Sequence, residues 1–111
     1  MRVWDLPPKE LCRKHLLGEH RELHGLWNIL TRHEGKGGYS HHPETKRWMG
    51  KLAALYARHE KLVLEMQRRG YRHASPLDKR LAKGGLQQRT YIDTLARQRE
   101  LLKLKHCDCG S

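Results

Sequence analysis

The stretch LCRKHLLGEHRELHGLWNIL, residues 11–30, decides the fold. Its apolar side chains recur every three or four residues, the spacing that places them on one face of an α-helix. Pro7-Pro8 precede the stretch, and proline is tolerated in the first turn of a helix. We therefore predict a first helix over residues 8–32. The apolar face consists of Leu11, Leu16, Leu23, Leu26, Trp27 and Leu30.

Two further helices are predicted downstream. Pro43-Glu44 opens the second, because a carboxylate suits the positive end of the helix dipole, and Gly70 suits a left-handed end. A basic loop follows at 71–85, and a third helix is predicted over 86–104. No strand pattern competes with these segments. We expect an all-α fold, a compact single domain (1–111) of three main helices with 105–111 as a flexible tail. The apolar stripe of the second helix comprises Trp48, Leu52, Leu55, His59, Leu62 and Met66.

The composition is strongly basic. The 111 residues include 23 Lys and Arg against 12 Asp and Glu, a formal net charge of +11. Such a charge favours a polyanionic partner, with nucleic acid first and an anionic membrane surface or acidic protein second. The sequence has no apolar run that could cross a bilayer and no signal-peptide core. We expect a cytoplasmic monomer that does not enter membranes, and three cysteines argue against a disulfide framework.

The densest polar cluster runs from Lys14 to Leu23. His15, Glu19 and Glu22 follow one another at i, i+4 and i+7, so they share a helix face. A carboxylate between histidines and arginines is compatible with acid–base catalysis. A solvated face with Glu–Arg pairs has the same pattern. The cluster alone therefore leaves a catalytic and a structural interpretation open.

The same segment resembles the first helix of the pyrimidine-dimer DNA glycosylase/AP lyase family of the bacteriophage endonuclease V type. That helix carries the run E-L-x-x-x-H-L-x-x-E-x-R-E-L, which is matched here from Glu10 to Leu23. The stretch KLVLEMQRRGY, residues 61–71, is similar to the family's long basic helix, which closes on Arg-Gly-aromatic. The resemblance covers roughly residues 1–73. It implies a DNA-repair enzyme that acts on damaged or abasic double-stranded DNA without a cofactor.

The resemblance also implies the site residues. The family uses the α-amine of its first mature residue as nucleophile, and the ungapped motif places Met1 at that position and Glu22 on the catalytic carboxylate. An α-amine has a reference pKa of about 7.7–8.0, so a useful fraction is neutral at physiological pH. Such an amine can displace a base from C1′, form an imine and permit β-elimination. The residues implied to bind DNA are Arg2, Lys14, His15, Arg21 and, as a looser match, Arg97.

The sequence departs from the family pattern in three places. The family's second arginine in this helix falls on Gly25, and its tyrosine falls on His20. Its aromatic C-terminal segment has no counterpart in residues 103–111. That segment helps to recognise the lesion, so we expect activity on abasic sites, which does not depend on dimer recognition.

Two other functions remain open. One is a non-enzymatic basic DNA- or RNA-binding module, and the other is a helical protein-interaction subunit. Only the enzyme needs an unblocked α-amine next to Glu22. A requirement for that amine therefore distinguishes the enzyme from both alternatives.

The remaining histidines, cysteines and tryptophans have mainly structural interpretations. The tail His106-Cys107-Asp108-Cys109 offers soft ligands without zinc-knuckle spacing, and His59 on the apolar stripe is expected to be a satisfied core histidine. No metal site is predicted. Trp4, Trp27 and Trp48 are candidates for wedging into DNA, although core positions suit Trp27 and Trp48 better than that role does.

Overall fold

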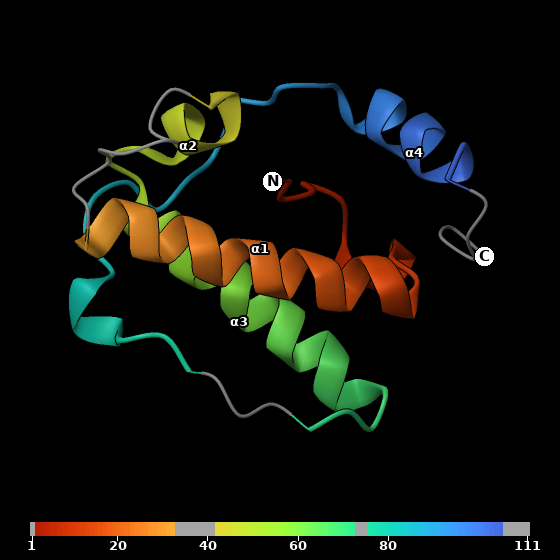
Figure 1. The fold of residues 1–111 in the computed structure, drawn as a ribbon, viewed down its shortest axis with the longest axis horizontal. Helices are drawn as coiled ribbons and strands as arrows, with labels where there is room; N and C mark the ends of the chain where they lie inside the picture. Colours follow the sequence, from red (N-terminus) through yellow and green to blue (C-terminus); the bar gives the residue numbers. More distant parts are fainter. Residues whose placement is uncertain (1, 33–41, 73–75, 106–111) are drawn as a thin grey trace.

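The computed structural model describes residues 2–32, 42–72 and 76–105 (Figure 1). Within these ranges the chain is helical and contains no β-strand, so the predicted all-α fold with three main helices is confirmed. The α-helices are α1 (Arg13–Arg32), α2 (Pro43–Trp48), α3 (Leu52–Arg68) and α4 (Leu95–Lys103), and the short 3-10 helices are η1 (Pro8–Glu10) and η2 (Lys79–Leu81).

The core lies between α1 and α3, which pack against each other (Figure 1). The predicted apolar faces of both helices meet there. Leu16, Leu23 and Leu26 from α1 are completely buried, as are Leu55 and Leu62 from α3. The helices α2 and α4 lie along one edge of this pair, and η2 lies along the opposite edge.

The first helix begins later than predicted. Pro8 does open a helical turn, but that turn is the 3-10 helix η1, and Leu11 after it is extended with φ −87° and ψ 135°. This conformation buries the Leu11 side chain almost completely. Regular α-helix starts at Arg13 because burial of Leu11 interrupts the helical backbone.

The predicted second helix is divided into α2 and α3. The short helix α2 ends where Met49 leaves the helical region with φ −58° and ψ 131°, and Gly50 after it adopts the left-handed conformation with φ +72°. The first turn of α3 then needs acceptors for its free N–H groups. The 83–85 segment supplies them, since Ala53 N donates to Lys83 O at 2.9 Å and Ala54 N to Gly85 O at 3.0 Å.

The third predicted helix is shorter than expected, because α4 begins at Leu95 and not at residue 86. Thr94 caps it, and its Oγ1 accepts a hydrogen bond from Arg97 N at 3.1 Å. The preceding residues bond to other elements. The side chain of Gln88 donates to Arg47 O at 2.7 Å and accepts from Lys51 Nζ at 2.8 Å. These long-range bonds hold 86–93 in a non-helical path.

The end of α3 follows the sequence prediction. Gly70 has φ +82°, and Tyr71 N donates to Met66 O while Gly70 N donates to Gln67 O, which is a Schellman motif. The tail predicted to be flexible lies outside the described residues apart from Lys105. Among the described helices, none combines the length and the apolar character needed to cross a membrane.

We expect Gly84→Ala to destabilise the protein by about 3 kcal/mol. Gly84 has φ +89°, and a Cβ at this position would collide with the backbone carbonyl of Gly50. The matched control is Gly70→Ala, which has the same unfavourable φ but nothing within 4 Å of its Cβ, and should lose about 1 kcal/mol. Urea unfolding monitored by tryptophan fluorescence measures both. Equal losses would contradict the close approach of 84 to 50.

Candidate active site

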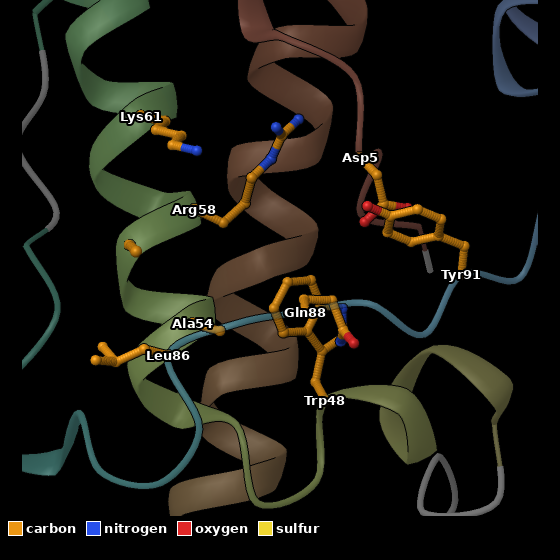
Figure 2. Close-up of a pocket in the computed structure, with 9 residues that line it drawn as sticks. Asp5, Trp48, Ala54, Arg58, Lys61, Leu86, Gln88 and Tyr91 are labelled. Carbon is orange, nitrogen blue, oxygen red and sulfur yellow. The ribbon is translucent and has the colours of Figure 1, made fainter. Parts of the chain in front are cut away.

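The N-terminal segment, residues 2–6, is fastened to the helix pair by a buried ion pair. Glu19 of α1 and Arg58 of α3 meet through two hydrogen bonds of 2.7 and 3.0 Å. Both side chains also form hydrogen bonds with the backbone of the segment. Trp4 N donates to Glu19 Oε1 at 3.0 Å, and Arg58 Nη1 donates to Leu6 O at 2.7 Å. Figure 2 shows the Arg58 side chain leaving α3 toward α1.

The surroundings of Glu19 make it a structural carboxylate. Burial raises the pKa of its carboxyl, while Arg58 and the Trp4 N–H act in the opposite direction. Both of its oxygens accept hydrogen bonds within the protein. Three of the about four acceptor positions of this carboxylate are thereby occupied within the protein.

Two further polar side chains hold the same segment. The buried Arg47 of α2 donates to Val3 O at 2.7 Å and to Asp5 Oδ1 at 2.9 Å. Gln98 of α4 accepts from Asp5 N at 2.8 Å and donates to Asp5 Oδ2 at 3.0 Å. Residues 2–6 are therefore bound to all four α-helices, which fixes the path of the chain next to its first residue.

A cavity of about 370 Å³ opens beside this segment. Its size is within the range of ligand-binding clefts. We call it the N-terminal pocket. Its lining residues are Arg2, Trp4, Lys14, His15, Gly18, Glu19, Arg21, Glu22 and Lys105.

The N-terminal pocket brings together most of the residues implied by the family resemblance, namely Arg2, Lys14, His15, Arg21 and Glu22. Met1 lies outside the described residues, so its position stays a prediction.

Arg97 is not part of this pocket. It lies exposed on α4 and pairs with Glu100 at 3.0 Å. A contact of Arg97 with DNA therefore remains a prediction that is separate from the pocket.

Arg2 is the most constrained cation of the pocket. Its guanidinium lies 4.5 Å from the centre of the Trp4 ring and donates to Asp93 at 3.0 Å. Its Nε has no hydrogen-bond acceptor among the described residues. Lys14, Arg21 and Lys105 add positive charge at exposed positions of the lining.

His15 contributes a different kind of group. Burial lowers the pKa of its imidazole, and the charges of Lys105 and Lys14 lower it further. At neutral pH the ring is therefore uncharged, with Cys12 Sγ 3.1 Å from Nδ1. A neutral imidazole can meet a phosphate through a hydrogen bond, and its charge becomes available only as the pH falls.

Glu22 is exposed on α1 and has no hydrogen bond or ion pair with any residue in the described ranges. It shares the pocket with four cationic side chains, yet its oxygens remain available. Glu22 therefore has the accessibility that an acid–base group requires and that Glu19, three residues earlier, lacks.

The sequence did not indicate that Trp4 and Lys105 line the pocket. Trp4 is 6% exposed and packs edge-on against His15 at 6.3 Å, so it forms a wall. Trp27 and Trp48 are also buried, as predicted for core positions. A wedging role for these tryptophans is not supported by their burial. Apart from its positive charge, nothing in the sequence indicates that Lys105 lies at this pocket.

The fold and the pocket define a class: an all-α domain with a cation-lined cleft that contains one accessible carboxylate. The family model described as pyrimidine dimer DNA glycosylase matches residues 1–79, more than two thirds of the chain. The chain therefore belongs to the pyrimidine dimer DNA glycosylase family, whose substrate is DNA. No curated protein and no solved structure matches it.

We expect substitution of the two glutamates of α1 to change the free energy of unfolding by different amounts. Glu19→Gln leaves the Arg58 charge buried without its counter-ion and should reduce the free energy of unfolding by about 3 kcal/mol. Glu22→Gln alters an exposed side chain and should change it by less than about 0.5 kcal/mol. Chemical denaturation of both variants tests this. A large loss for Glu22→Gln would mean that Glu22 has a structural role.

Proposed function

We propose that the protein is a bifunctional DNA glycosylase/AP lyase that cuts DNA at damaged or abasic sites. The nucleophile is the α-amine of Met1, and Glu22 is the catalytic carboxylate. One copy of the chain supplies every group that the reaction needs, so we propose that it acts as a monomer on double-stranded DNA in the cytoplasm.

The arrangement of the N-terminal pocket is the observation that supports this proposal most strongly. Arg2, the neighbour of the proposed nucleophile, lines the same 370 Å³ cavity as Glu22. The segment that follows Met1 is held by buried hydrogen bonds at Val3 and Trp4 and by a partly buried one at Asp5. We expect the amine within about one hydrogen bond, or one bridging water, of the Glu22 carboxylate.

The reaction begins when the neutral amine attacks C1′ of the damaged nucleotide. The bond from C1′ to the base breaks, and the base leaves with the electron pair and takes up a proton. The amine then loses a proton, the bond from C1′ to O4′ opens, and O4′ is protonated, which gives the imine. On an abasic site the amine condenses directly with the sugar aldehyde and releases water.

Elimination completes the cut. The imine acidifies the C2′ proton, and its removal expels the 3′ phosphate oxygen with the electrons of the C3′–O bond. Water then hydrolyses the imine and restores the amine. Glu22 stabilises the positive charge on the sugar and carries the protons between these positions.

The cations of the pocket hold the phosphates on either side of the reacting sugar. Arg2, Lys14 and Arg21 supply charge, and His15 supplies a neutral donor at physiological pH. These contacts position the nucleotide without reading its sequence. Excision of pyrimidine dimers needs recognition beyond them, so cleavage of abasic sites is the minimal activity that we propose.

Borohydride trapping on abasic duplex DNA tests the nucleophile. Sodium borohydride should reduce the transient imine and leave the protein covalently attached to DNA, with the link at the α-amine of Met1. Acetylating the N-terminus should abolish trapping, because an amide nitrogen is not nucleophilic. It removes at most one positive charge from a chain of +11 and should barely change DNA affinity. A lysine-linked adduct, or trapping by the acetylated protein, would exclude the N-terminal mechanism.

The role of Glu22 is tested in the same assay. Glu22→Gln should slow strand cleavage by about 100-fold or more, the scale of lost acid–base catalysis. Imine formation on an abasic site, where no glycosidic bond has to break, should be less affected. A non-enzymatic DNA-binding module would show neither trapping nor cleavage in any variant.

Phosphate contacts are tested by the dependence of DNA affinity on salt. Log K should fall linearly with log salt, and Lys14→Ala or Arg21→Ala should each make the slope shallower by about 0.9. Lys46→Ala, an equal change of charge at an exposed position of α2 outside the pocket, is the control and should leave the slope unchanged.

Gly25→Arg gives the converse test. Gly25 lies three residues after Glu22 on the pocket side of α1, with open space around its Cβ. An arginine there should steepen the slope by about 0.9 if it adds one phosphate contact. No change in slope would mean that the bound phosphates do not extend to this turn of α1.

A further inference from the structure

Three histidines from two helices meet on the side of α1 away from the N-terminal pocket. His20 and His24 lie one turn apart on α1, and His59 lies on α3. One ring nitrogen of each lies within 4.8 Å of the others. His24 Nε2 and His59 Nε2 lie 3.2 Å apart. His59 is completely buried and the other two are half-buried.

A carboxylate orients the buried histidine. His59 Nδ1 lies 3.0 Å from Glu60 Oε1. An ionised carboxylate only accepts hydrogen bonds, so the ring proton is placed on Nδ1, and the lone pair of Nε2 accepts a hydrogen bond from His24 Nε2, which a bound ion would replace. Metal-binding histidines are held in this way, with the second ring nitrogen bonded to a carboxylate that fixes the tautomer and raises the basicity of the ligand.

We propose that His20, His24 and His59 form a binding site for a divalent transition-metal ion of the zinc class. Three imidazole nitrogens suit such an ion, and three protein ligands leave a fourth position for water. Two nitrogens bound to zinc at 2.0–2.1 Å with a tetrahedral angle lie about 3.3–3.4 Å apart. The 3.2 Å separation of His24 and His59 is close to this value.

The site has room to complete its coordination. The ring of His20 must approach the other two slightly, and its half-buried position on α1 allows this rotation. His24 also borders a hollow of about 430 Å³ between α1 and the 76–81 segment, through which water can reach the open position. None of the three histidines lines the pocket that contains Glu22, so the ion would join α1 to α3 and take no part in the proposed reaction.

Titration of the full chain with Zn²⁺ after chelator treatment tests the site. Calorimetry should give one ion per chain, and Co²⁺ should give the visible d–d absorption of a four-coordinate site. Zinc at 100 times its Kd should raise the thermal midpoint by roughly 10 °C, because the ion binds the folded state. Absence of a stoichiometric binding event would overturn the proposal.

Two substitutions assign the ligands without altering the buried His59. His24→Gln removes a half-buried ligand and should abolish the Co²⁺ spectrum. Glu60→Gln weakens the orienting bond to His59 and should lower zinc affinity by about 10- to 100-fold. Its matched control is Glu100→Gln, also an exposed helical glutamate, which should leave affinity unchanged.

The C-terminal tail is the alternative source of metal binding. Replacing Cys107 and Cys109 together by serine should leave the affinity and the Co²⁺ spectrum unchanged. Loss of binding in this variant, or full binding by His24→Gln, would place the ion elsewhere and exclude the three-histidine site.

Discussion

The buried ion pair between Glu19 and Arg58 is the constraint on which the rest of the structure depends. Removing two charges from water is favourable only when every donor and acceptor finds a partner. The helices alone do not meet that condition. The backbone groups of Trp4 and Leu6 complete it, so the N-terminal segment is part of the same buried network as the α1–α3 contact. The position of the segment is thereby coupled to the pairing of the helices.

This coupling bears directly on chemistry that uses a terminal amine. The first residues of a chain usually fray, and a frayed nucleophile would lose the advantage of a fixed orientation. Here Arg47, Gln98 and the Glu19–Arg58 pair anchor the residues that follow the first one. The stability of the fold therefore helps to position the N-terminal end. The accessible Glu22 takes no part in these anchoring contacts among the described residues.

The sequence predicted the parts of the fold that depend on local periodicity, and it could not predict those that depend on distant partners. Apolar spacing located the buried faces of α1 and α3. The break between α2 and α3 depends on hydrogen bonds with the 83–85 segment. The late start of α4 depends on Gln88, whose side chain hydrogen-bonds with Arg47 and Lys51. The motif contained both Glu19 and Glu22, but only Glu19 is buried, because it pairs with Arg58. That partner lies 39 residues away in the sequence, so local periodicity does not reveal it. Similarly, His20 and His24 lie one turn apart in the sequence of α1, whereas His59 joins them only through the packing of α1 on α3.

Three faces of α1 therefore contact different parts of the structure. Its 3.6-residue turn places Arg21 and Glu22 toward the N-terminal pocket, Glu19 and Leu23 toward the core, and His20 and His24 toward the other edge of α3. The ion pair and the proposed metal site both act on the distance between α1 and α3, but they do so from neighbouring faces. An ion held by the histidines would reinforce the helix contact that the Glu19–Arg58 pair already makes. Neither the ion pair nor the proposed metal site uses the oxygens of Glu22, so both leave that carboxylate available, whereas the N-terminal segment stays coupled to the ion pair.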